Sequence, residues 1–215
     1  MKRDLVHLIS DQPPQLIDPC ITCLEQSGFR VRACQSVAVL CDQYDPLNPT
    51  CILAMMQARE LFGVEIHRTL QMQNILAPVI ILSHFADIPM AVAAIKQGAF
   101  DVLPYPSSEA DLKKTVTEAI SSDAKRLKIK KAREDLQAKL ETLTPREIEI
   151  LQHVVNGLCS SQIAYQFSRS EKTIKLHRAH IMKKLAFESA HELVQQMIKL
   201  QFDLDHIAES CVAVQ

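Results

Sequence analysis

Several features are missing from this 215-residue sequence, and each absence excludes a class of protein. No apolar run approaches the roughly 18 residues that cross a membrane, so no membrane-spanning helix is expected. The first residues, MKRDLVHLISDQPP, contain only a short apolar run that Asp11 and two prolines interrupt, which argues against a signal peptide. The seven cysteines are odd in number and unevenly spaced, unlike a disulfide framework, so we expect reduced thiols in a cytoplasm.

A strong net charge is also missing, because 24 Lys and Arg residues are balanced by 25 Asp and Glu residues. The balance differs along the chain. Residues 1–122 carry 9 basic and 13 acidic residues, whereas residues 123–200 carry 15 basic and 9 acidic residues. This asymmetry predicts that only the back half binds a polyanion.

The front half alternates short apolar segments with segments whose apolar residues have helical spacing. Continuous apolar strands are typical of a parallel sheet that helices cover on both faces. We therefore expect an α/β, doubly wound, five-stranded parallel sheet with strands at residues 5–10, 29–36, 51–55, 77–83 and 100–106.

Three stretches of this half resemble the receiver domain of bacterial response regulators, most closely the FixJ type. They are VHLISDQ at the first strand, GVEIHRTL after the third, and PVIILSHFADIPMAVAAIKQGAFDVLPYP across the fourth and fifth. The resemblance implies a receiver-like, flavodoxin-like fold, in which phosphoryl chemistry takes place at the carboxyl ends of the strands.

The resemblance also identifies the positions of a receiver's phosphorylation site. The two acidic residues that hold Mg²⁺ match Ser10 and Asp11, and the phosphoacceptor aspartate matches Met55. The hydroxyl residue matches Ser83, and the lysine that precedes a proline matches Tyr105. Three of these five positions have lost the expected residue type.

The chemistry at these positions predicts a degenerate receiver, which we call a pseudo-receiver. An acyl phosphate needs a carboxylate nucleophile, and the thioether of Met55 has no oxygen that could accept the group. Mg²⁺ requires several hard oxygen ligands, so Asp11 alone is a weak site and no cofactor is expected. Tyr105 cannot pair with a phosphoryl charge as a lysine does. We expect the domain to act without aspartyl phosphorylation.

A helical linker is expected at residues 123–141, DAKRLKIKKAREDLQAKLE, which contain neither Gly nor Pro. Leu127, Ala132, Leu136 and Leu140 recur at helical spacing and form a narrow apolar seam. The sequence leaves two interpretations open, a helix that supports a dimer and a plain spacer.

The back half predicts a small all-α domain of four helices. Thr144, followed by Pro145 and Glu147, forms a capping box with proline at the first helical position, so the first helix begins there and ends at Gly157. Two short helices about the tight turn SRS then form a helix-turn-helix, and a fourth helix runs from about residue 189 to residue 200.

The motifs LTPRE, VVNGL, QIA and KTIKLHRAHIMKKL resemble the LuxR-type DNA-binding domain. The resemblance implies that the third helix of this domain lies in the DNA major groove. On its outward face, the positions that face the bases are Lys175, Leu176 and Ala179. Contacts to phosphate, which set the register, are expected from Lys172, Thr173, Arg178 and Lys183. His177 has the spacing of a core residue.

A redox or metal input through cysteine is an open alternative. Cys20 and Cys23 have C-x-x-C spacing, and Cys34, Cys41 and Cys51 lie in the same half, so a metal or Fe–S centre is conceivable. However, Cys20 and Cys23 fall within an expected helix and Cys51 within an expected buried strand. Free cysteine is a common core residue, so no metal site is expected.

These features predict a sequence-specific DNA-binding transcriptional regulator rather than an enzyme, because no position pairs a nucleophile with a base. Its expected partners are double-stranded promoter DNA and a second copy of the chain, and no contact with a membrane is expected. The expected location is the bacterial cytoplasm. The expected organisation is a pseudo-receiver domain at residues 1–122, a helical linker at 123–141, a LuxR-type domain at 142–202 and an acidic tail at 203–215.

In place of aspartyl phosphorylation we expect control by permanent dimerisation, by a small ligand near Met55 and Tyr105, or by a protein partner. Two alternative functions stay open. One is a regulator still switched by a covalent input, either phosphorylation elsewhere or cysteine oxidation. The other is an interaction protein that antagonises another regulator by heterodimerisation.

Overall fold

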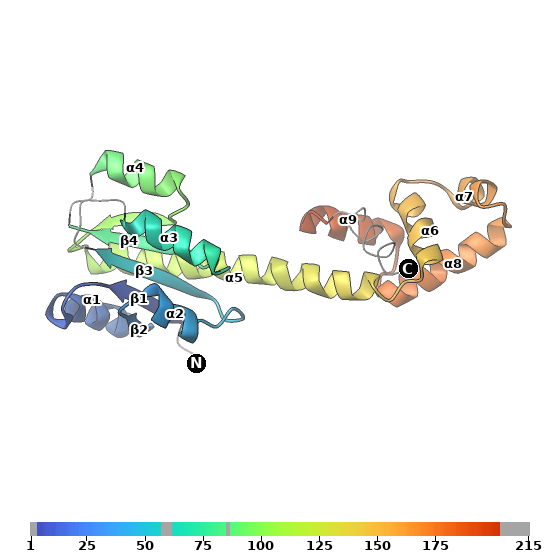
Figure 1. Ribbon diagram of the computed structural model, residues 1–215. Helices are drawn as coiled ribbons and strands as arrows, with labels where there is room; N and C mark the ends of the chain where they lie inside the picture. The colour runs from blue at the N-terminus through green and yellow to red at the C-terminus, as the bar shows by residue number, and fades with distance from the viewer. Residues whose placement is uncertain (1–3, 57–61, 85–86, 203–215) are drawn as a thin grey trace. The chain divides into compact units, whose positions relative to one another are not determined.

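The structure, a computed structural model, describes residues 4–56, 62–84 and 87–202 (Figure 1). By internal packing the chain divides into two units, Met1–Leu127 and Lys128–Gln215. Each unit has its own hydrophobic core in the described part of the chain.

The first unit is built on a five-stranded parallel sheet with the strand order β2-β1-β3-β4-β5, which confirms the expected fold class. Strands β2, β4 and β5 are shorter than expected, because each is limited to the residues that pair with a neighbouring strand. The strands are β1 (Leu5–Ser10), β2 (Arg30–Cys34), β3 (Thr50–Met56), β4 (Val79–Ser83) and β5 (Asp101–Pro104).

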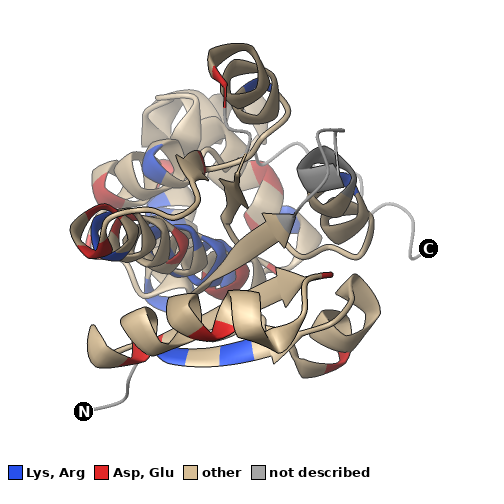
Figure 2. Ribbon diagram, turned by 90° about the vertical axis from the view of Figure 1, so that its left-hand side faces the viewer, with Lys and Arg blue, Asp and Glu red and all other residues tan. Residues whose placement is uncertain are grey.

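The central strands are buried on both faces, as their apolar sequences predict. Val6, Leu8 and Met55 pack against one helical layer, and Ile9 and Ile52 pack against the other. In Figure 2 the central strands carry no charge, and the blue bands on a strand mark the edge strand β2. The first layer consists of α1 (Pro14–Gln26) and the start of α5 (Glu109–Leu140), and the second of α2 (Val37–Gln43), α3 (Phe62–Met72) and α4 (Ile88–Lys96).

A buried polar contact fixes α5 to the amino end of the sheet. Asp123 is 1% exposed, and its Oδ2 accepts a hydrogen bond from the backbone N–H of Thr50 at 3.1 Å. Its Oδ1 pairs with the guanidinium of Arg126 at 2.8 Å. The Thr50 hydroxyl in turn donates to the carbonyl oxygen of Leu5 at 2.7 Å, so α5, β3 and β1 are joined at one point.

His7 is a fully buried residue of β1, and neither ring nitrogen has a hydrogen-bond partner in the described part of the chain. Burial lowers the pKa of His7 to about 4, and the positive charges of Arg32 and Arg30 act in the same direction. The imidazole is therefore neutral at neutral pH.

One continuous helix, α5, covers residues 109–140, so the segment expected as a linker helix at residues 123–141 is not a separate helix. No Gly or Pro interrupts α5, and Asp123 is held inside the fold of the first unit. In the described ranges, no helix combines the length and apolar character needed to cross a membrane.

The second unit contains the four helices that the sequence predicts. They pack around a core to which each helix contributes its inward face, with Leu151, Ile163, Ile181 and Leu193 completely buried. The helices are α6 (Pro145–Val155), α7 (Ser160–Gln166), α8 (Glu171–Leu185) and α9 (Ala190–Leu200).

The last turns of α5 belong to the core of this second unit. Leu136 is 3% exposed, Leu140 is completely buried, and Ala132 packs against the same cluster. Three of the four residues of the expected linker's apolar seam are therefore covered within the second unit, and the fourth, Leu127, is half-buried. This packing supports neither of the two interpretations of the linker, because Leu136 and Leu140 are core residues rather than part of a plain spacer or of an exposed dimer surface.

Candidate functional site

The five receiver-site positions lie together at the carboxyl edge of the sheet. In the strand pairing Ser10 is opposite Met55, and Ser83 is opposite Pro104, the residue before Tyr105. The Tyr105 backbone N–H donates to the carbonyl oxygen of Ser83 at 2.9 Å. Asp11 directly follows β1. The spacing in the sequence thus brings together the residues that the resemblance identifies.

Met55 is fully buried at this edge and belongs to the core that α1 and α5 cover. Met55 is the position that the resemblance matches to the phosphoacceptor aspartate. Asp11 is exposed, and Ser10 accepts a hydrogen bond from the backbone N–H of Gln12 at 3.0 Å. Among the described residues, no cluster of three or more His, Cys, Asp or Glu side chains could hold a metal ion.

Tyr105 is turned toward α1. Its hydroxyl donates a hydrogen bond to the carbonyl oxygen of Leu16 at 2.9 Å. Its ring and that of His84 lie edge to face, with 5.1 Å between the two ring centroids. Burial raises the pKa of the Tyr105 hydroxyl, and nearby Cys20 raises it further. The side chain therefore tethers β5 to α1 as a neutral phenol.

Gln12 is a buried residue of this edge that sequence reasoning missed. It is 7% exposed, and its amide nitrogen and oxygen have no hydrogen-bond partner among the described residues. Its place two residues after Ser10, in the loop that follows β1, was the only signal available from sequence.

The helix-turn-helix of the second unit consists of α7, a tight turn and α8. In the turn, Ser168 has a positive φ of 50° and the N–H of Arg169 donates to the carbonyl oxygen of Ala164 at 3.0 Å. Ser170 caps α8 by accepting a hydrogen bond from the N–H of Thr173 at 3.1 Å.

One face of α8 is exposed and rich in basic residues. Ile174 and Ile181 point into the core, and His177 is half-buried, as its spacing predicts. The exposed positions include five of the seven predicted DNA contacts, which are Lys172, Lys175, Leu176, Ala179 and Lys183.

The other predicted contacts of α8 have partners within the protein. The Thr173 hydroxyl is 2.7 Å from that of Ser170. Arg178 is half-buried, and its guanidinium is turned toward Leu158 and Ser160 at the start of α7. Among the exposed contacts, Lys175 also has a partner, since its Nζ lies 2.7 Å from Oε1 of Glu171 one turn earlier.

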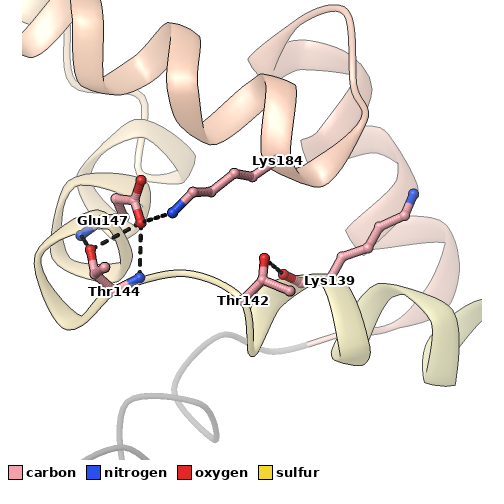
Figure 3. A network of polar contacts seen from close by, with 5 residues as sticks. All are labelled: Lys139, Thr142, Thr144, Glu147 and Lys184. Carbon is pink, nitrogen blue, oxygen red and sulfur yellow. Dashed lines mark hydrogen bonds and ion pairs between the residues drawn. The ribbon is translucent and has the colours of Figure 1, made fainter.

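A network at the start of α6 joins it to the end of α8 (Figure 3). Oε2 of Glu147 accepts hydrogen bonds from the Thr144 backbone N–H at 2.9 Å, the Thr144 hydroxyl at 3.0 Å and the Lys184 ammonium at 2.7 Å. Burial alone would raise the pKa of the Glu147 carboxyl, but the bonds from Lys184 and Thr144 outweigh it and hold the pKa below its ordinary value. This network confirms the predicted capping box.

Cys159, another residue that the sequence analysis missed, is exposed immediately before α7. Its Sγ lies 3.0 Å from the Ser161 hydroxyl. Hydrogen bonds from Ser161 and the Gln162 backbone lower the pKa of this thiol, whereas burial raises that of Cys51 and Cys20.

The chain matches two families of known proteins. Residues 6–117 match the response regulator receiver domain, and residues 141–197 match the bacterial regulatory proteins of the luxR family. Response regulator protein TmoT of Ectopseudomonas mendocina is 29% identical over 202 residues, or 94% of this chain and 92% of TmoT.

Transcriptional regulatory protein FixJ of Azorhizobium caulinodans is 30% identical over 193 residues, which cover 90% of this chain and 91% of FixJ. The solved structure of the response regulator StyR has a TM-score of 0.76 and 27% identity, covering 92% of this chain and 100% of the StyR chain. The chain therefore belongs to the response regulators of the FixJ and LuxR type, which are DNA-binding transcriptional regulators and not enzymes.

Proposed function

We propose that this protein is a sequence-specific transcriptional regulator whose pseudo-receiver acts without aspartyl phosphorylation. The observation that carries the proposal is the fully buried Met55 at the carboxyl end of β3, where the resemblance places the phosphoacceptor. A thioether inside the core offers no nucleophilic oxygen to a phosphodonor.

The other edge positions support the same proposal. Asp11 is the single acidic residue among the five and is exposed, so Mg²⁺ would find one carboxylate where it needs several oxygens. Tyr105 is bonded to Leu16 of α1 and provides no cation for a phosphoryl group. Without a nucleophile, a complete metal site or a cation, the edge keeps only Asp11 and the Ser83 hydroxyl of the five switch positions.

For DNA binding we propose that α8 lies in the major groove. The uncharged side chains of Leu176 and Ala179 and the ammonium of Lys175 would face the bases. The exposed pair of Lys175 with Glu171 contributes little to stability, so Lys175 can exchange that partner for a base. Phosphate contacts are proposed for Lys172, Thr173 and Lys183.

A second copy of the chain is the proposed partner of α4. This helix is apolar until Lys96, but Ala94 is its one buried residue. Ile88, Val92 and Ile95 are 80%, 46% and 49% exposed and recur at the spacing of a single helix face. An exposed apolar stripe is typical of an interface, and an uncharged stripe can pair with its own copy about a two-fold axis. We place the dimer in the bacterial cytoplasm.

Acetyl phosphate with Mg²⁺ tests the loss of phosphorylation. We expect the intact mass and the affinity for a duplex selected by the protein from a random library to stay unchanged. A response regulator that retains its aspartate is the positive control and should gain one phosphoryl group. A phosphoryl group on the pseudo-receiver would overturn the proposal, and failure to select any duplex would favour the antagonist that heterodimerises.

Oxidation of Cys159 is a second candidate input, favoured by its exposure and by the lowered pKa of its thiol. Peroxide should then weaken DNA binding by the wild type but not by Cys159→Ser. Equal responses of the two proteins would exclude this input.

A further inference from the structure

Arg178 of α8 makes a contact that differs from the phosphate contact expected of it. Its Nη1 donates toward the Ser160 hydroxyl at 3.3 Å and toward the carbonyl oxygen of Leu158 at 3.5 Å. Leu158 and Ser160 lie at the start of α7, twenty and eighteen residues earlier in the chain. Arg178 is a half-buried residue, unlike the exposed Lys172, Lys175 and Lys183.

The position of this contact allows it to orient α8 relative to α7. The tight turn around Ser168 joins the end of α7 to the start of α8. Arg178 lies about two turns into α8 and joins that point to the other end of α7. Ile163 of α7 and Ile174 of α8 already pack in one core, but apolar packing is not directional. The Arg178 contact adds a directional polar attachment at the end of α7 that lies away from the turn, and so helps to fix the angle between the two helices.

That angle decides how α8 presents its outward face. Side chains that read bases must reach donors and acceptors at fixed places in the groove. Lys175 and Ala179 flank Arg178 on the same helix, so a rotation of α8 moves both away from their bases. The electrostatic attraction to phosphates depends far less on this angle.

We infer that Arg178 is a positioning residue for sequence-specific DNA recognition, which acts through Ser160 and Leu158 rather than through a phosphate. The inference rests on the DNA-binding function proposed above. It assigns to Ser160 the role of an acceptor inside the protein. It also separates Arg178 from Lys183, the exposed basic residue of the same helix that is expected to contact phosphate.

The test uses the full chain and two duplexes of equal length, one selected by the wild type from a random library and one unrelated. Affinities are measured over a series of salt concentrations for Arg178→Met and for the matched control Lys183→Met. Loss of one phosphate contact lowers the slope of log affinity against log salt by about 0.9 and weakens both duplexes. That is the expected result for Lys183→Met.

For Arg178→Met we expect the affinity for the selected duplex to fall about tenfold, which is the size of one lost base contact. The affinity for the unrelated duplex and the slope of log affinity against log salt should change little. A slope reduced as in Lys183→Met, with equal losses on both duplexes, would overturn the inference. If the wild type selects no duplex, DNA recognition itself fails, which is a distinct outcome.

Ser160→Ala provides a second measurement that leaves every charge in place. It should reduce affinity for the selected duplex in the same direction as Arg178→Met. The double variant should lose no more affinity for the selected duplex than Arg178→Met alone, because the two residues act through one contact. Additive losses would show that they act independently and would refute the positioning role, and Ser160→Ala alone decides the question if Arg178→Met does not fold.

Discussion

Replacing Glu147 with alanine removes three hydrogen bonds that meet at one carboxylate oxygen (Figure 3). The Glu147 side chain is 10% exposed, so water cannot fully replace the lost bonds. The bonds to Thr144 form an N-cap, which contributes about 1 kcal/mol. The bond to Lys184 contributes about 1 kcal/mol more after screening, because the lysine side chain is 40% exposed. We expect Glu147→Ala to lower the free energy of unfolding of the second unit by about 2 kcal/mol.

Hydrogen exchange measured by mass spectrometry on peptides from α6 and α8 reports this loss within the intact chain. Glu149→Ala is the matched control, because Glu149 pairs with Arg146 at the same distance of 2.7 Å but is 53% exposed. We expect a cost of about 0.5 kcal/mol or less for the control. A double-mutant cycle with Lys184→Met isolates the pair, and its coupling energy should be about 1 kcal/mol.

The same network makes the stability depend on pH. The pKa of Glu147 is lowered in the folded state, so its contribution is complete above the carboxyl's ordinary pKa of 4.5 and is lost as the pH falls through the lowered value. The cost of Glu147→Gln should therefore be largest at neutral pH and should shrink in acid. Equal costs for Glu147→Ala and Glu149→Ala, or a cost that does not change with pH, would refute this reasoning.

Three further predictions concern residues elsewhere in the chain. His7, with a pKa near 4 in the fold against 6.5 ordinarily, should make the first unit lose stability as the pH falls from 6.5 to 4, by up to about 3 kcal/mol. His7→Leu should remove most of this loss in urea unfolding at pH 7 and pH 4.5, and a variant with the wild-type pH response would exclude His7 as its cause. N-ethylmaleimide should label Cys159 before the buried Cys51, and simultaneous labelling in the native state would contradict their different exposure. Asp123→Ala leaves the Thr50 N–H without its acceptor and should lower the free energy of unfolding of the first unit by about 2 kcal/mol. A loss no larger than the roughly 0.5 kcal/mol of an exposed ion pair would show that water replaces the carboxylate.

The positions of the strands follow from patterns that the sequence displays directly. Continuous apolar runs such as VIILS can be buried on both faces only inside a covered parallel sheet. The capping box at Thr144 is equally local, because its donor and acceptor lie within one helical turn. Local patterns of this kind explain why the fold class and the four helices of the second unit were predictable.

The features that sequence reasoning missed depend on partners that are distant in the chain. Helical spacing gives the direction of Arg178 but not its contact with Ser160, eighteen residues away. Likewise, Asp123 reads as a surface residue of a charged segment, and its bond to Thr50 spans seventy-three residues. Such contacts also explain why the linker was expected to begin as a separate helix at residue 123, although α5 already begins at Glu109.

The burial of Leu136 and Leu140 in the second unit has a consequence for how these modules can be recombined. A fusion that begins at residue 142, where the recognisable motif starts, would discard two core side chains and leave a cavity in the DNA-binding unit. A functional exchange of receivers, by an engineer or by gene recombination, must therefore place its junction before Ala132. The part of the chain inherited together with the DNA-binding helix is longer than the motif itself.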